Sequence, residues 1–155
     1  MKSNIIIKKL IKKKITISVV ESCTGGMLSS KISSVPGCSK IFNCGIVSYS
    51  NLAKEKILNV KKKNLKKYGA VSSQICKDMV NNLKKISKSQ LCISTTGIAG
   101  PTGGTFLKPV GLVYIGIAFN GYTKIYMFNF NKKLTRKKIQ TLTVNKIFKL
   151  LELII

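Results

Sequence analysis

Residues 15–26 read ITISVVESCTGG, and this stretch decides the fold. Its first half, Ile15–Val20, is short and rich in β-branched residues, which is typical of a buried strand. The strand runs directly into the polar, glycine-rich segment Glu21–Gly26. A helix is then expected over about 26–35, because Pro36-Gly37 would end it. A strand that turns through glycines into a helix is the basic unit of an α/β protein.

Strands and helices alternate along the rest of the chain. Further strands are expected at 45–49, 91–96, 110–119 and 123–130, the last two joined by a turn at Asn120-Gly121. Helices are expected at 1–14, after a cap at Ser50 or Asn51, after a cap at Ser72 or Ser73, and at the C-terminus. Helical spacing predicts core positions at Ile75, Met79, Leu83 and Ile86 and marks the closing helix at Ile139, Leu142, Ile147, Leu150 and Ile154. The alternation predicts one α/β domain over residues 1–155, a three-layer α/β/α sandwich.

Positive charge dominates the composition, with a formal net charge of +24. Nearly all of it is lysine, and Arg136 is the one arginine. Lysine accompanies abundant isoleucine and asparagine, all encoded by AT-rich codons, so drift toward AT would produce this profile on any fold. Proteins selected to bind nucleic acids usually use arginine as well, because its fork makes bidentate contacts. We therefore expect weak, nonspecific binding to polyanions and a solvated face at the lysine run 61–67.

Cysteine and histidine usage narrows the chemistry. The five cysteines form no close pair, and the sequence contains no histidine. A zinc site built from Cys and His and a disulfide framework are both disfavoured, and we expect no metal and no cofactor. The absence of histidine excludes Ser-His-Asp and Cys-His catalysis. Any nucleophile must therefore be activated by another base.

The chain shows no sign of membrane insertion or secretion. No apolar run approaches the roughly 18 to 20 residues that cross a bilayer, and lysines interrupt the apolar residues of the first fourteen positions. For positions 1–14, a first helix that caps the fold is favoured over the alternative of a basic amphipathic membrane helix. We expect a cytoplasmic protein with reduced thiols and no membrane partner.

Two segments combine a strand end with glycine-rich polar sequence, at Glu21–Gly26 and at Thr95–Thr105. In α/β sheets, ligands bind outside the carboxyl ends of strands, where glycines let the backbone approach closely and helix N-termini present N–H groups. The two segments predict one crevice for an anionic ligand, lined by Thr24, Gly25, Gly26, Thr96 and Gly97. Neither segment matches the P-loop or GxGxxG pattern, and each glycine alone would also fit an ordinary turn.

A series of motifs resembles the CinA C-terminal domain family. The motifs are Glu21-Ser-Cys-Thr-Gly-Gly26, Pro36-Gly37, Tyr49-Ser-Asn-Leu-Ala-Lys54, Gly69-Ala-Val-Ser72, Thr96-Gly-Ile-Ala-Gly-Pro101, Gly103-Gly104 and Lys108-Pro-Val-Gly111. Their order and intervals agree with the family over essentially the whole chain. Active members hydrolyse the amide of nicotinamide mononucleotide to nicotinic acid mononucleotide and ammonia, in pyridine nucleotide recycling. The resemblance implies this amidase activity and a homodimer.

The reaction needs a nucleophile, a base and donors for the oxyanion. Ser22 is suited to be the nucleophile, since it follows a strand and precedes a helix whose N–H groups can stabilise negative charge. The resemblance implies a lysine base, for which Lys54 is the matching residue. Its pKa must then be lowered by burial or by nearby positive charge. Tyr49 is expected to orient the amide or relay a proton, and Ser39 to bridge the serine and the lysine.

Other readings of these residues remain open. Ser22 could be only a helix cap, Lys54 a surface lysine and Tyr49 a packed aromatic. Cys23, beside the same helix start, could replace Ser22 as the nucleophile. Glu21, one of only four acids, could anchor Lys54 or a neighbouring backbone amide.

The sequence also departs from the family pattern. Cys38 stands before Ser39, where the family usually has two small hydroxyl residues. The family's Gly-Asp-Arg near the C-terminus is replaced by a segment with Lys132 and Lys133, and a lysine cannot reproduce a fork contact. Arg136 matches a second family arginine, so Lys132 and Arg136 are the expected ligand-binding cations. These changes leave two alternatives, an eroded family member and a nonenzymatic nucleotide- or nucleic-acid-binding protein.

Overall fold

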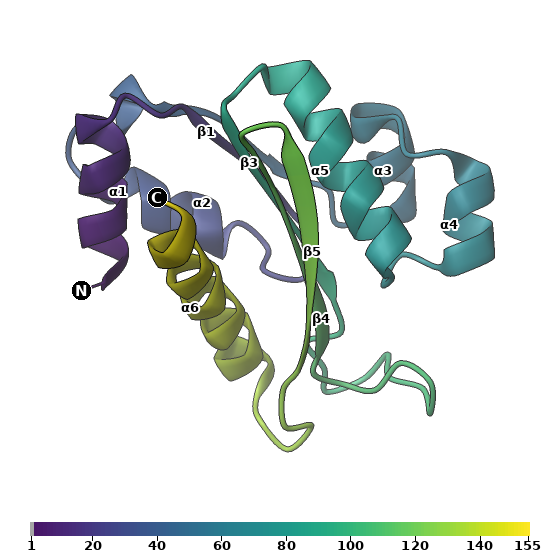
Figure 1. Cartoon of the computed structure of the whole chain (residues 1–155). Coiled ribbons are helices and arrows are strands. Elements are labelled where there is room, and N and C mark those ends of the chain that lie inside the picture. The colour runs from purple at the N-terminus through teal and green to yellow at the C-terminus, as the bar shows by residue number, and fades with distance from the viewer. Residues whose placement is uncertain (1) are drawn as a thin grey trace.

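A mixed five-stranded sheet forms the middle of the molecule, in a computed structural model that describes residues 2–155 (Figure 1). The strand order is β2-β1-β3-β4-β5. The strands are β1 (Ile17–Glu21), β2 (Phe42–Val47), β3 (Leu91–Gly97), β4 (Leu112–Phe119) and β5 (Tyr122–Asn129). The predicted strands are all present, and β2 begins three residues earlier than expected.

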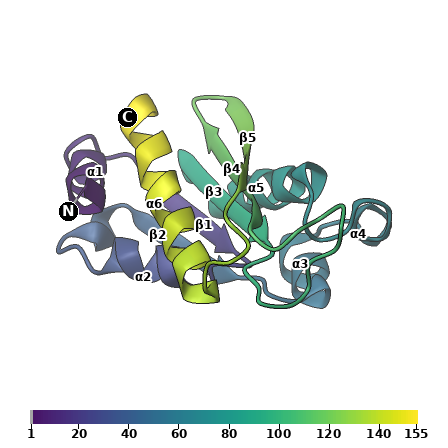
Figure 2. The ribbon, with the colours of Figure 1, turned by 90° about the horizontal axis from the view of Figure 1, so that it is seen from below.

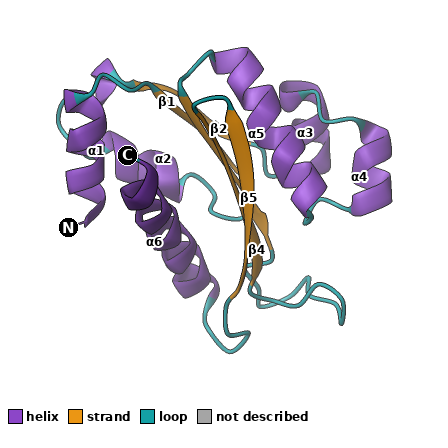
Figure 3. Ribbon diagram, in the orientation of Figure 1, coloured by secondary structure: helices purple, strands orange, loops and turns teal. Residues whose placement is uncertain are grey.

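Helices cover both faces of this sheet, which confirms the three-layer α/β/α sandwich (Figure 3). On one face lie α1 (Lys2–Lys12), α2 (Met27–Ser33) and α6 (Arg136–Ile154). On the other face lie α3 (Asn51–Leu58), α4 (Lys62–Tyr68) and α5 (Ser73–Ser87), and the view from below separates the two groups (Figure 2). A short 3₁₀ helix, η1, spans Cys38–Lys40. No helix within residues 2–155 is long and apolar enough to cross a membrane.

The pairing of the strands brings two chain segments to one edge of the sheet. β1 is parallel to both of its neighbours, β2 and β3, so the carboxyl ends of all three strands meet. β3 and β4 are antiparallel, as are β4 and β5. The β4–β5 hairpin turns at Asn120 and Gly121 with φ of 50° and 81°, as a two-residue turn with two positive φ angles requires. The two glycine-rich segments predicted to share a crevice therefore start side by side.

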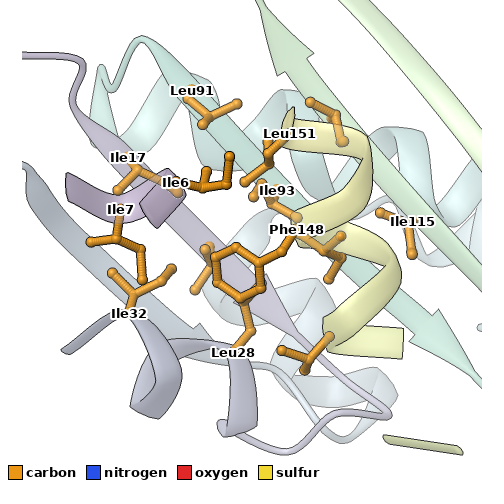
Figure 4. Close-up of a cluster of buried hydrophobic side chains, with 14 of the residues drawn as sticks. Ile6, Ile7, Ile17, Leu28, Ile32, Leu91, Ile93, Ile115, Phe148 and Leu151 are labelled. Carbon is orange, nitrogen blue, oxygen red and sulfur yellow. The ribbon is translucent and has the colours of Figure 1, made fainter. Parts of the chain in front are cut away.

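Two apolar clusters hold the layers together. The larger packs α1, α2 and α6 on the sheet, with Ile7, Leu28, Ile93 and Phe148 among its buried residues (Figure 4). The smaller packs α5 on the opposite face through Ile75, Met79 and Leu83, each without solvent exposure. Burial on both faces explains why β1 and β4 are largely apolar, whereas the outer strands β2 and β5 alternate between more and less exposed residues.

Two interpretations of the sequence need correction or extension. Ile86 is 46% exposed, so its assignment to the core is wrong. It lies in the last turn of α5 and lines an open hollow together with Asn82 and Lys85. The lysine run at 61–67 does form a solvated face, but it folds into α4 because Leu65 is buried beneath it. Met1, the first residue of the predicted 1–14 helix, lies outside the described residues.

The carboxylate of Glu21 organises the start of α2. It is fully buried and accepts hydrogen bonds from the N–H groups of Gly26, Leu28 and Ser29 at 3.1, 3.0 and 2.7 Å. The Ser29 hydroxyl donates a further bond at 2.7 Å. Glu21 therefore anchors backbone amides, one of the two roles considered for it, and its charge complements the positive end of the helix. The same bonds fix the loop that carries Ser22.

Replacing this carboxylate should destabilise the protein strongly. In Glu21→Gln the side-chain N–H₂ faces N–H donors, which lose a charged acceptor inside the protein. We expect a loss of about 3 kcal/mol in the free energy of unfolding, measured by urea denaturation. Glu55→Gln makes the same change at a partly exposed position and should cost no more than about 0.5 kcal/mol. Equal losses in the two variants would contradict the capping role.

Candidate active site

Ser22 and Lys54 meet at the carboxyl edge of the parallel strands. Ser22 directly follows β1, and Lys54 lies in the first turn of α3. Lys54 Nζ lies 3.0 Å from Ser22 Oγ. The two side chains are 8% and 1% exposed, so the contact is inside the protein. Lys54 is therefore not a surface helical lysine, and the Ser22 hydroxyl faces an amine.

Carbonyl oxygens are the other partners of the Lys54 amine. Nζ donates to the carbonyls of Ser48 at 2.8 Å and of Tyr49 at 3.3 Å. Burial lowers the pKa of Lys54 from 10.5 to about 8. Desolvation penalises the ammonium form, and neither of these carbonyl dipoles replaces a full negative charge.

This set of partners suits a neutral amine. A neutral amine has two N–H donors and one lone pair, which match the two carbonyls and the Ser22 hydroxyl. In that state the hydroxyl of Ser22 donates its hydrogen bond to Nζ. A hydroxyl that donates to a neutral amine has the arrangement of a nucleophile with its general base.

Backbone hydrogen bonds fix both members of the pair. The N–H of Ser22 donates to the Thr95 carbonyl at 3.1 Å, which continues the β1–β3 pairing by one residue. The N–H of Ser48 donates to the Glu21 carbonyl at 2.8 Å and extends the β1–β2 pairing in the same way. Ser50 caps α3 by accepting from the N–H of Ala53 at 3.0 Å. Ser22 and Lys54 are thus held by sheet and helix, not by mobile loops.

A crevice of about 240 Å³ opens beside this pair. Its lining comprises Ser22, Cys23, Tyr49, Lys54, Ala70, Val71, Thr96, Gly97, Ile98, Ala99, Gly100, Thr102, Gly103 and Arg136. The walls are largely apolar or backbone, and one arginine supplies positive charge. This composition suits a small, flat, partly apolar ligand with an anionic group.

Tyr49 and Arg136 lie at the rim of the crevice. Tyr49 is 59% exposed, so it is not a packed strand aromatic. The Arg136 guanidinium donates to the Tyr49 hydroxyl through one nitrogen and to the Gly100 carbonyl at 2.9 Å through the other. Arg136 is the first residue of α6, and its side chain thereby connects three segments around the opening.

Of the other predicted ligand residues, some line the crevice and some only support the surrounding structure. Thr96 and Gly97 line the crevice, but the Thr96 hydroxyl donates to the Ala70 carbonyl at 2.8 Å and so holds the wall. A Cβ at Gly97 would lie 2.7 Å from the Leu112 carbonyl oxygen, so only glycine fits there. Thr24 is buried with its hydroxyl 2.8 Å from that of Thr95, outside the lining. Gly25 and Gly26 form the positive-φ turn before α2 and do not line the crevice.

Two predicted residues lie away from the pair. Ser39 is exposed on η1 and does not line the crevice, so within this chain it does not bridge Ser22 and Lys54. Lys132 is exposed and lines a neighbouring hollow beside residues 101–106.

The N–H groups at the start of α2 were expected to stabilise negative charge near Ser22. They donate to the Glu21 carboxylate instead, so they are not available to an oxyanion.

The geometry disfavours Cys23 as the nucleophile. Its side chain is 5% exposed, and burial raises the pKa of the thiol to about 12. Almost none of it is thiolate at neutral pH, whereas thiolate is the reactive form. The neighbouring Ser22 is the residue whose hydroxyl contacts the Lys54 amine.

The sequence interpretation missed several contributors to the site. Ala70, Val71 and the loop residues Ile98, Ala99 and Gly100 form much of the wall; all of them lie within motifs that resemble the family, but none was predicted individually as a ligand contact. The Ser48 and Tyr49 carbonyls were missed because any residue type supplies a carbonyl. Gln140 was also missed; it donates from α6 to the Cys23 carbonyl at 2.8 Å and supports the Ser22 loop.

One larger cavity of the described chain lacks a nucleophile. This cavity of about 450 Å³ lies between α5, α4 and the connection that precedes α4, and its lining is mainly asparagine and lysine, with no serine, cysteine or threonine. Within residues 2–155, no group of three or more His, Cys, Asp or Glu side chains is placed to hold a metal ion.

Comparisons with known proteins agree with the fold and the motifs. The family model described as the CinA C-terminal domain matches residues 2–155. A competence-damage inducible protein of Thermoanaerobacter pseudethanolicus is 54% identical over 140 residues, and a CinA-like protein of Prochlorococcus marinus is 47% identical over 153 residues. These alignments cover 90% and 98% of this chain. The chain spans about a third of the length of these relatives, 33% and 36%.

Solved structures are similar over nearly the whole chain. A competence/damage-inducible protein from Agrobacterium tumefaciens has a TM-score of 0.91 and 31% identity, covering 97% of this chain and 94% of that one. A CinA superfamily protein from Escherichia coli has a TM-score of 0.93 and 26% identity, covering 99% and 88%. The chain belongs to the CinA C-terminal domain family.

Proposed function

We propose that this protein is an amidohydrolase that converts nicotinamide mononucleotide to nicotinic acid mononucleotide and ammonia. The observation that carries the proposal is the 3.0 Å contact between Ser22 Oγ and the buried amine of Lys54. The names of the relatives described above state no enzyme activity, so the reaction is inferred from this geometry together with the family's general link to deamidation. Small-molecule turnover in the cytoplasm fits five cysteines that form no disulfide.

In the first half of the reaction Ser22 acts as the nucleophile. Its Oγ attacks the carboxamide carbon while Lys54 Nζ accepts the hydroxyl proton. The tetrahedral intermediate then expels ammonia, which takes its proton from the Lys54 ammonium. The product is an ester between Ser22 and the nicotinoyl group, and Lys54 is again neutral.

In the second half water cleaves this ester. Lys54 accepts a proton from the water as its oxygen attacks the acyl carbon, and it returns the proton to Ser22 Oγ as the ester bond breaks. Nicotinic acid mononucleotide leaves with its new carboxylate. One residue therefore serves as base and acid in both halves, as microscopic reversibility permits.

The crevice offers separate surfaces for the parts of this substrate. The apolar wall at Ala70, Val71 and Ala99 suits the pyridinium ring, and Arg136 suits the phosphate as a fork-shaped donor. Tyr49, which shares a hydrogen bond with Arg136, lies where it can contact the ribose or the amide. Lys132, in the adjoining hollow, adds positive charge without a fork contact.

Removing either member of the pair should abolish ammonia release. We expect Ser22→Ala and Lys54→Met to lower kcat by about a thousandfold or more. Lys54→Arg should be equally inactive, because arginine keeps the charge but does not deprotonate in proteins. The measurement is ammonia release from nicotinamide mononucleotide with EDTA present.

Ser30→Ala and Lys63→Met are matched controls on exposed helix positions and should retain wild-type turnover. Substantial activity in Ser22→Ala would overturn the nucleophile assignment. A folded wild type that binds the mononucleotide without turnover would support an eroded family member instead. Binding only to polyanions, lost steeply with salt, would support a nucleic-acid-binding protein.

The pH dependence of turnover should follow the Lys54 amine. With its pKa lowered to about 8 by burial, the active neutral form is the minority below that pH. We expect kcat/KM to fall about tenfold per pH unit below about pH 8 and to level off above it. A profile that is flat between about pH 6 and pH 9 would contradict Lys54 as the base.

The pH dependence of the free energy of unfolding should reveal the lowered pKa of Lys54 without any substrate. Because the pKa of Lys54 is about 8 folded and 10.5 unfolded, the unfolded chain binds more protons between these values, so folding becomes more favourable as pH rises through them. Relative to Lys54→Met, the wild type should gain about 2 kcal/mol in unfolding free energy from about pH 7.5 to pH 10. Urea denaturation measures the gain, and the difference between wild type and Lys63→Met should stay constant. A constant difference for Lys54→Met as well would disprove the lowered pKa.

A further inference from the structure

The loop between β3 and β4 forms one wall of the crevice without any regular structure of its own. Residues 98–103 contribute five lining positions, and the loop reaches from the sheet toward the side of α3 and α4 (Figures 1 and 2). A second part of the wall is the connection between α4 and α5, which contains Ala70 and Val71. Segments of this kind depend on a few tethers for their order.

Three tethers hold the loop. At its base, the N–H of Ile98 donates to Leu112 O and the N–H of Gly111 donates to Ile98 O, both at 2.8 Å. In its middle, the Gly100 carbonyl accepts from Arg136 at 2.9 Å. Beyond the tip, Lys108 Nζ donates to the Tyr68 carbonyl at 2.6 Å.

Local structure fixes both the donor and the acceptor of the hydrogen bond from Lys108 to Tyr68. The residue closes a tight turn with Thr105, whose N–H donates to the Lys108 carbonyl at 2.8 Å and whose hydroxyl accepts from the Lys108 N–H at 3.0 Å. Tyr68 is the last residue of α4, so the ammonium also faces the negative end of a helix. A Cβ at Gly69 would lie 3.0 Å from Nζ, which shows how closely the side chain passes over the backbone.

The connection between α4 and α5 is also held by a hydrogen bond from the sheet. The Thr96 hydroxyl donates to the Ala70 carbonyl, two residues after the one that Lys108 holds. Tyr68–Ala70 is therefore fixed between a strand end and the β3–β4 loop. Lys108 itself does not line the crevice, and its half-buried ammonium is already engaged.

We infer that Lys108 is a positioning residue that joins these two wall segments of the ligand crevice and sets its width. The role in ligand affinity rests on the proposed function. Ser22 and Lys54 are held by β1, β2 and α3, none of which this tether touches. Loss of the tether therefore weakens binding and leaves the chemical step intact, because a wall that must be ordered on binding reduces affinity.

The test compares Lys108→Met with Lys63→Met, the same substitution at an exposed lysine of α4. We expect Lys108→Met to raise the KM for nicotinamide mononucleotide by about tenfold, with kcat within about twofold of wild type. Hydrogen exchange in peptides covering 68–72 and 98–109 should become faster in this variant only. Lys108→Arg, which keeps a cationic donor, should recover most of both effects.

Unchanged exchange in Lys108→Met overturns the tether, whatever the activity. Faster exchange with unchanged KM, or with the loss confined to kcat, overturns the positioning role. A wild type without turnover would refute the proposed function alone. The dissociation constant for nicotinic acid mononucleotide would then replace KM, and an unchanged constant in Lys108→Met would count against the inference.

Discussion

The buried amine of Lys54 is the feature on which the site depends. A lysine that is 1% exposed and bonded to two carbonyls and a hydroxyl carries its positive charge at a cost. Burial therefore lowers its pKa to about 8, which makes a proton acceptor available near neutral pH. A protein without histidine needs another base to activate a serine. Desolvation of Lys54 provides this base, because it disfavours the ammonium form and so favours the neutral amine.

The fold makes this arrangement possible through the direction of its strands. β1 is parallel to β2 and β3, so the chain leaves all three at one edge, and the serine after β1 faces the helix after β2. Glu21 then satisfies the start of α2 from inside, which leaves Ser22 at the end of a rigid strand. α6 completes the enclosure, since Gln140 supports the Ser22 loop and Arg136, one turn earlier, reaches the rim.

The fold could largely be predicted from the sequence because apolar strand runs and glycine turns carry local signals. The layers, the strands and the Asn120-Gly121 turn follow from such patterns. Which positions of a helix are covered depends on tertiary contacts, so Ile86 fitted the helical period although it lines an open hollow beside Asn82 and Lys85. Leu65 is a single apolar residue among lysines, too little for a pattern to predict α4.

The site was predictable only where side chains carry the chemistry. Ser22, Tyr49 and Lys54, which come from two of the quoted motifs, lie at one crevice with Arg136, the match to a second family arginine. Ser39 and Lys132 do not join them, because motif spacing gives an order along the chain and not the direction a loop takes. Other contacts could not be predicted from residue type, because they depend on backbone position and long-range geometry. They are the carbonyls of Ser48 and Tyr49 and the hydrogen bonds of Gln140 and Lys108.

Direct titration of the Lys54 side chain tests the central claim most closely. NMR of protein carrying ¹³C-labelled lysine, with the Lys54 signal identified by its loss in Lys54→Met, gives the midpoint for this amine among all the others. We expect a midpoint near pH 8, well below the ordinary lysine value of 10.5. A Lys54 midpoint near 10.5, the ordinary value for a lysine, would contradict it, because the amine would then be protonated near neutral pH and could not accept the Ser22 proton.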